Sequence, residues 1–191
     1  MRIRIAFAAS CLPFALLAQR ATTGSVPTNG VAQTFLSFGQ PYGYWLVVAL
    51  DSIPANQYQF HPTSVQQTVG FIAQHLEDAN YQLCAKIGGQ LPNRSSKDSA
   101  SDTIKARWPK DTLTARVRAS LEFCGAAIRK LSDAQLADTL MVATSNGPQP
   151  VLRVRYLILL VTDLAEHYAQ LAGYMRALGL VPPSALPAPQ R

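Results

Sequence analysis

Asp163 and His167 are four positions apart in the segment "YLILLVTDLAEHYAQLAGYMRALGL", which is otherwise rich in apolar residues. In a helix, residues at this spacing lie on one face, one turn apart. A carboxylate at the edge of an apolar interior is costly unless a partner compensates its charge. Two such side chains can share a metal ion, as histidine pairs at this spacing do in zinc enzymes. The alternatives are that Asp163 orients His167, or that both are polar surface residues.

A third ligand has to come from another segment, and the sequence contains only three histidines. His75 lies in "FIAQHLEDAN", on a predicted helix, in a column that borders the apolar stripe. His61, in the extended link "FHPT", is predicted to be a surface or packing residue. The set His75, Asp163 and His167 would form a site of two histidines and one carboxylate. Three protein ligands leave positions open for a water or thiol, and zinc, iron, nickel and manganese all accept these donors.

Cys84 and Cys124 are the two cysteines that follow the N-terminal segment. Cys84 is nine residues beyond His75, which on a helix is the opposite side and about 13 Å further along the axis. It therefore cannot easily share a site with His75. In an oxidising compartment the two cysteines could form a disulfide between two helices. A disulfide and two buried free thiols are equally compatible with the sequence.

Four amphipathic segments are predicted to position these residues. The apolar spacing predicts helices over residues 35–53, 65–87, 111–131 and 151–178, and Thr63 or Ser64 is the expected cap of the second. A polar connection of residues 88–110 separates the second and third helices, "TSNGPQP" is predicted to be a loop, and no segment shows a convincing strand pattern. The predicted fold is all-α, a four-helix bundle over residues 35–183 with a long connection between helices 2 and 3, followed by a disordered tail at 184–191.

The N-terminal residues have the pattern of an export signal. Arg2 and Arg4 precede an apolar run from Ile5 to Ala18, which is shorter than the roughly 20 residues of a membrane span. We therefore expect residues 1–18 to be a signal peptide and residues 19–34 a flexible leader. The mature protein would be periplasmic or secreted, without a stable membrane span. The alternative is a buried or frayed N-terminal helix.

The net charge of +6 does not point to a nucleic-acid partner. Eight basic side chains fall between Lys86 and Arg118, but Asp98, Asp102 and Asp111 are interleaved with them. Nucleic-acid sites combine a basic stripe with stacking aromatic side chains or a known reading motif, and we find neither. The basic residues of this region are interpreted as a solvated surface.

Several stretches together resemble the DinB-like family of small bacterial four-helix proteins. They are "SIPANQYQFHPTSVQQTVGFIAQHLEDANYQLC" from Ser52, "VRASLEFC" from Val117, "EHYAQLAGYMRALGLVPPS" from Glu166 and the long link between the second and third helices. The likeness covers residues 35–186. Its most specific part is the combination of the second-helix histidine and "DAN" with the ending of the last stretch.

The resemblance implies a metal site of three histidines, one on the second helix and two on the fourth in an H-x-x-x-H pattern. His75 matches the first position and His167 the last, whereas Asp163 stands at the middle one. An aspartate can ligate the same ions, or it can mark a member that has lost its metal. Glu166 and Tyr168 are the residues predicted to support the ligands.

The resemblance also implies a homodimer and a thiol-dependent transferase or isomerase activity, in which a metal activates bacillithiol or mycothiol. Our hypothesis is an exported protein whose single divalent metal activates a thiol or water against a small molecule. The rival hypothesis is a non-catalytic bundle that acts through dimerisation or partner binding, with Asp163 and His167 as a hydrogen-bonded pair. Tyr42, Tyr44 and Trp45 could then belong to its interface, although core packing is the use that we expect of them. The two hypotheses differ in whether His75 must approach both fourth-helix residues.

Overall fold

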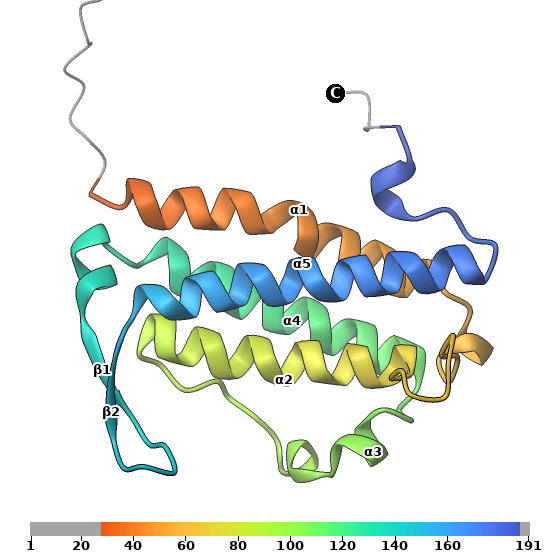
Figure 1. Cartoon of the computed structure of the whole chain (residues 1–191), viewed down its shortest axis with the longest axis horizontal. Helices are drawn as coiled ribbons and strands as arrows, with labels where there is room; N and C mark the ends of the chain where they lie inside the picture. The colour runs from red at the N-terminus through yellow and green to blue at the C-terminus, as the bar shows by residue number, and fades with distance from the viewer. Residues whose placement is uncertain (1–27, 188–191) are drawn as a thin grey trace, which may run out of the picture.

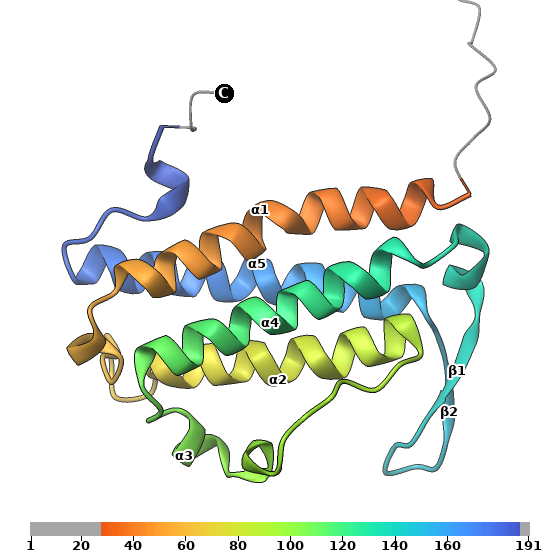
Figure 2. The same ribbon diagram turned by 180° about the vertical axis from the view of Figure 1, so that it is seen from behind.

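Four long helices account for most of residues 28–187, the part of the chain that this computed structural model describes. They are α1 (Gly30–Ser52), α2 (Val69–Gly88), α4 (Lys110–Arg129) and α5 (Val154–Ala177). Helix α2 packs against α4 and α5, and α1 packs against the same two helices. Figures 1 and 2 show α2 and α5 on one side of the bundle and α1 and α4 on the other. The predicted four-helix bundle is therefore confirmed, whereas the predicted signal peptide lies outside the described residues.

Helix α1 begins at Gly30, inside the segment that was predicted to be a leader. Its N-terminus is capped by a residue distant in the sequence. Asp133 accepts hydrogen bonds from the backbone N–H groups of Val31 and Ala32, both at 2.9 Å. A carboxylate at a helix N-terminus satisfies free N–H groups and complements the helix dipole. The predicted flexible leader of residues 19–34 was therefore wrong from Gly30 onward, because the neighbouring sequence contains no sign of this cap.

Helix α2 begins at Val69 rather than at Val65, so the predicted cap at Thr63 or Ser64 was wrong. Thr68 is the cap, and its side chain accepts a hydrogen bond from the Phe71 N–H at 3.1 Å. The following Gly70 is required by close packing, because a Cβ there would lie 2.2 Å from the backbone oxygen of Ala106. The link before α2 is therefore held against the connection that precedes α4.

A β-hairpin precedes α5, contrary to the prediction of a loop without strands. Strands β1 (Thr139–Val142) and β2 (Gln149–Leu152) pair antiparallel and project from one end of the bundle (Figure 1). Gly147 adopts a φ of 89° in the turn, a left-handed conformation that glycine accepts without strain. Because β2 extends to Leu152, α5 starts at Val154 and not at the predicted residue 151.

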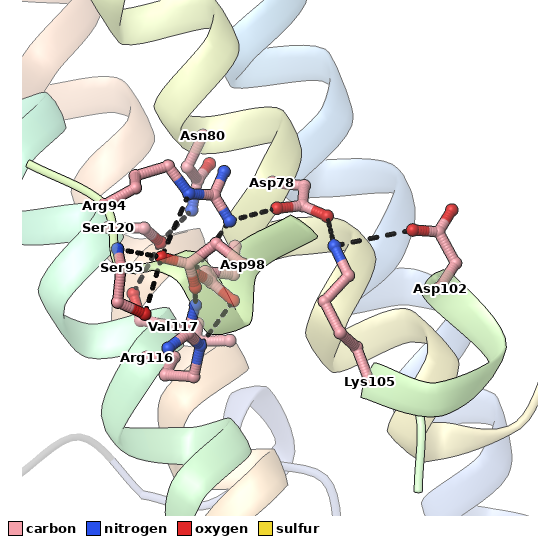
Figure 3. A network of polar contacts seen from close by, with 11 residues as sticks. Asp78, Asn80, Arg94, Ser95, Asp98, Asp102, Lys105, Arg116, Val117 and Ser120 are labelled. Atoms are coloured by element: carbon pink, nitrogen blue, oxygen red, sulfur yellow. Dashed lines mark hydrogen bonds and ion pairs between the residues drawn. The ribbon is translucent and has the colours of Figure 1, made fainter. Parts of the chain in front are cut away.

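The connection between α2 and α4 is ordered by charged side chains and contains the short helix α3 (Asp102–Lys105). Figure 3 shows the ionic network that attaches it to α2 and α4. The Arg116 guanidinium donates to Glu77 at 2.7 and 2.8 Å, and Lys105 pairs with Asp78. We call this set the connection network; its members are Glu77, Asp78, Arg94, Asp98, Lys105 and Arg116. The prediction of a solvated surface was wrong for its three basic residues.

Cys84 of α2 and Cys124 of α4 are joined by a disulfide with a Cα–Cα distance of 5.1 Å. Both residues are buried. The bond links two neighbouring helices in the bundle core, toward the C-terminal ends of both. Among the described residues, no helix is both long and apolar enough to cross a membrane.

Candidate metal centre

His75, Asp163 and His167 converge between α2 and α5. Asp163 Oδ1 lies 3.8 Å from Nε2 of His75 and 3.4 Å from Nε2 of His167. The centroids of the two imidazole rings are 4.8 Å apart. One possible ligand atom from each residue lies within 4.8 Å of the other two. The structure thus brings together the three residues on which the metal hypothesis depends.

Helix packing explains this convergence. On α5, Leu160, Leu164 and Leu171 are buried in the core, and the face beside them carries Asp163 and His167 one turn apart. On α2, the core residues Ile72 and Leu76 flank His75 and turn its side chain toward α5. The apolar stripes therefore determine the rotation of both helices, and the polar residues at their edges meet.

The centre is open to solvent on one side. The side chain of His75 is 42% exposed, that of Asp163 22% and that of His167 11%. Solvent access is consequently greatest at the α2 side, while His167 lies deepest. An ion held among the three side chains could still exchange a coordinated water for a small ligand.

The electrostatics of the centre favour a cation. Burial by itself would raise the pKa of Asp163, but hydrogen bonding and charge interactions with His167 and His75 outweigh it and lower the pKa to about 2. Burial lowers the pKa of His167, yet the Asp163 carboxylate more than compensates and the pKa is raised. Asp163 is therefore an anion at neutral pH, and it stabilises positive charge placed beside it.

Two observations show that these residues fit a divalent metal ion. Oδ2 of Asp163 is buried without a hydrogen-bond partner among the described residues, although such an oxygen is costly to leave unpaired. Ligand atoms at about 2.1 Å from a tetrahedral zinc ion lie roughly 3.4 Å from one another, and the Asp163 distances of 3.4 and 3.8 Å are close to that value. Two imidazoles and a carboxylate suit zinc, iron, nickel or manganese.

The residues that support His167 differ from those expected. Glu166 is exposed, and its charge only contributes to raising the pKa of His167. Tyr168 faces away from the centre, because its hydroxyl accepts a hydrogen bond from the Ser184 N–H at 2.8 Å and its ring lies 5.1 Å from that of Trp45. The same hydrogen bond holds Ser184 to the bundle, at the start of the tail that was predicted to be disordered.

Gln170 and Tyr174 occupy the supporting positions instead. Nδ1 of His167 lies 3.2 Å from Oε1 of Gln170, and Nε2 of Gln170 donates to the Tyr174 hydroxyl at 3.0 Å. The sequence carried a signal for both, because they follow His167 by three and seven residues on the same helical face. The third histidine, His61, is exposed and bonded to the Thr63 carbonyl, as a surface residue would be.

Solved structures share this fold. A DinB-like protein from Bacillus cereus is 18% identical, with a TM-score of 0.61 over 79% of this chain and 95% of its own. A conserved protein from Enterococcus faecalis is 16% identical, with a TM-score of 0.59 over 78% of this chain and 96% of its own. A mycothiol-dependent maleylpyruvate isomerase is 15% identical, with a TM-score of 0.59 over 73% of this chain and 60% of its own.

Sequence comparison adds a family. No curated protein matches the chain significantly. The family model of the DinB superfamily matches residues 46–171, which include the C-terminal end of α1 from Leu46, all of α2 and α4, and α5 as far as Leu171. The match contains His75, Asp163 and His167, and it agrees with the helical fold of the solved structures. This chain therefore belongs to the DinB superfamily.

Proposed function

We propose that this protein binds one divalent transition-metal ion through His75, Asp163 and His167, and that it uses the ion to activate a small thiol or water against a small electrophilic molecule. The observation that carries the proposal is the convergence of the three side chains: Oδ1 of Asp163 lies near both imidazoles, and its Oδ2 is buried without a partner among the described residues. A hydrogen-bonded pair of Asp163 and His167 alone would not require His75 to approach them.

The three ligands and their surroundings would have different roles. Asp163 supplies the negative charge that offsets a dication, and the two imidazoles supply neutral nitrogen donors. The exposed side of His75 leaves room for the reacting molecule. When bound, such an ion lowers the pKa of a thiol or water and presents it as a nucleophile at neutral pH.

A thiol is the first nucleophile to test, because one solved structure with this fold is named as a mycothiol-dependent isomerase. That likeness, at 15% identity, is support from the fold only. The centre itself favours a small, negatively charged ligand atom, since a dication with a single carboxylate retains a net positive charge. A thiolate and a hydroxide both satisfy this requirement.

Cobalt substitution distinguishes the two nucleophiles. Metal-free protein is loaded with Co²⁺, and its absorption spectrum is recorded before and after addition of a small thiol such as 2-mercaptoethanol. A new thiolate-to-cobalt charge-transfer band, absent from His167→Ala, is the result expected for thiol activation. Cobalt binding without this band would point to water, and failure of cobalt and zinc to bind would contradict the proposal.

We also propose that the protein is exported. The disulfide between Cys84 and Cys124 supports this, because stable disulfides persist in oxidising compartments. The basic and then apolar pattern of residues 1–18 supports it independently. The test is the intact mass of protein from the periplasm: a mature N-terminus near residue 19 with two hydrogens lost at the cysteines is expected. An intact N-terminus in cytosolic protein would contradict it.

A further inference from the structure

A chain of hydrogen bonds runs from His167 away from the candidate metal centre. Nδ1 of His167 lies 3.2 Å from Oε1 of Gln170, and Nε2 of Gln170 lies 3.0 Å from the hydroxyl oxygen of Tyr174. The Tyr174 hydroxyl in turn lies 2.8 Å from the backbone oxygen of Gln67. The chain ends on a main-chain carbonyl just before α2, so it joins the two helices that supply the three ligands.

The direction of this chain is determined by its last acceptor. A carbonyl oxygen can only accept, so the single hydroxyl proton of Tyr174 is donated to Gln67. The hydroxyl oxygen must then accept from the Gln170 amide nitrogen, which places the Gln170 amide oxygen toward His167. An amide oxygen also only accepts. Nδ1 of His167 must therefore carry a proton.

We propose that Gln170 and Tyr174 are positioning residues that keep the proton of neutral His167 on Nδ1, in competition with the Asp163 carboxylate 3.4 Å from Nε2. The lone pair of Nε2 then points toward Asp163 and His75. The inference rests on the proposed function for its purpose, since a lone pair at Nε2 is what a metal ion requires. The hydrogen-bond geometry behind the inference is a property of the metal-free protein and holds whether or not the proposed function is right. The opposite tautomer would donate from Nε2 to Asp163 and leave His167 without a lone pair for a metal ion at this centre.

Burial makes the arrangement rigid. The Tyr174 side chain is 1% exposed, and its ring lies edge-on to that of Phe60 at 6.0 Å. Rotation of the hydroxyl away from Gln67 would leave a buried donor unpaired, which is costly. Outer hydrogen bonds of this kind orient metal-ligating histidines, and their loss reduces metal affinity by about 10- to 100-fold.

Variants of the chain test each link. Gln170→Ala removes the acceptor at Nδ1, and Gln170→Glu restores an acceptor without the amide. Tyr174→Phe removes only the hydroxyl that orients the amide. Tyr156→Phe is the matched control, because Tyr156 is a buried tyrosine of the same helix without a hydroxyl hydrogen bond to the centre in the described structure.

The first readout is the tautomer of His167 in metal-free mature protein, from ¹⁵N chemical shifts at alkaline pH, where the ring is neutral. We expect the Nδ1–H form in the wild type, Tyr156→Phe and Gln170→Glu, and a shift toward Nε2–H in Gln170→Ala and Tyr174→Phe. An Nε2–H ring in the wild type, or no change in either of these two variants, would overturn the inference. This readout is independent of metal binding.

The second readout is the zinc dissociation constant, measured by competition with a chromophoric chelator. Gln170→Ala and Tyr174→Phe should weaken binding about 10- to 100-fold, and Gln170→Glu should recover most of that loss. Unchanged zinc affinity in both Gln170→Ala and Tyr174→Phe would overturn the positioning role. A wild type that binds no zinc but has the Nδ1–H ring would contradict the proposed function instead.

Discussion

Two polar clusters use neighbouring residues of α2 and compensate buried charge in different ways. In the connection network, three carboxylates face two guanidinium groups and one lysine, and Figure 3 also shows the exposed Asp102 paired with that lysine. In the candidate metal centre, one carboxylate faces two imidazoles. Glu77 of the network is only two residues from His75, so one short stretch of helix contributes to both clusters.

The difference indicates what each cluster is for. The six members of the connection network carry equal numbers of acidic and basic groups, and they attach the long connection to the bundle. In the candidate metal centre, the charge of Asp163 is compensated only when something positive lies beside it, either a proton on an imidazole or a metal ion. Of the carboxylate oxygens in the two clusters, only Oδ2 of Asp163 is buried without a partner within the described residues. Each carboxylate of the connection network thus has cationic partners within the chain, whereas Asp163 retains an oxygen that could ligate an ion.

The largest expected effect is on stability, from the network. Glu77→Ala should lower the free energy of unfolding by about 3 kcal/mol, because it leaves the Arg116 and Arg94 guanidinium groups without their buried acceptor. Urea unfolding measures the change. Glu122→Ala is the control, since Glu122 is exposed on α4 and has no ion pair in the described structure; its change should stay within about 0.5 kcal/mol. A folded Glu77→Ala variant that lost zinc affinity would contradict the claim that the two clusters act independently.

The next effect should come from zinc at the candidate metal centre. At a free concentration of about 100 times its dissociation constant, zinc should stabilise the protein by about 2.7 kcal/mol and raise Tm by about 5–10 °C. Asp163→Asn should abolish this rise, yet change the stability of the metal-free protein by less than about 1 kcal/mol. Calcium, which prefers several oxygen ligands, is the control and should give no rise. An equal zinc response in Asp163→Asn would contradict the site.

The smallest expected effect is the pH dependence of stability in the metal-free protein, which should differ between the two clusters. The pKa of Asp163 is lowered and that of His167 is raised, so their pairing contributes stability between the ordinary values of about 3.9 and 6.5. This contribution is lost as the pH falls through about 2, and again as it rises through the raised pKa of His167. Thermal unfolding from pH 6 to 9 should show the alkaline loss in the wild type and not in His167→Gln.

Asp78 provides the contrast. Burial would raise its pKa, but Lys105 and Arg94 outweigh burial and lower it. Its stabilisation is thus present above the ordinary aspartate pKa and disappears only as the pH falls through the lowered value. Since lysine and arginine keep their charge at pH 9, Asp78→Asn should leave the alkaline loss unchanged. If the alkaline loss of stability vanished in Asp78→Asn, it would come from the connection network and not from Asp163 and His167.

The sequence was sufficient for the bundle and for the three residues of the candidate metal centre. The helical period places Asp163 and His167 on one face beside an apolar stripe, and His75 occupies the equivalent edge of α2. These relations are local to each helix, and the packing of two apolar stripes then brings the edges together. Helical geometry also excluded Cys84 as a ligand beside His75, because it places Cys84 on the opposite side of the helix.

The features that sequence reasoning missed depend on partners distant in the chain. Asp133, just after α4, caps α1 at Gly30, and no local pattern predicts a contact between residues about 100 positions apart. The charges of residues 88–118 look like a solvated surface until Glu77 and Asp78 of α2 are placed beside them. Short strands such as β1 and β2 carry a weak periodic signal, and the Asn146–Gly147 turn was their clearest indication.

The most direct test of the central claim is the metal content of mature, untagged protein purified without chelators, measured by elemental analysis beside His167→Ala. The account predicts about one transition-metal ion per chain in the wild type and little in the variant, as expected when one of three protein ligands is lost. No metal in the wild type even after reconstitution, or equal amounts in both proteins, would contradict it and leave Asp163 and His167 as a hydrogen-bonded pair.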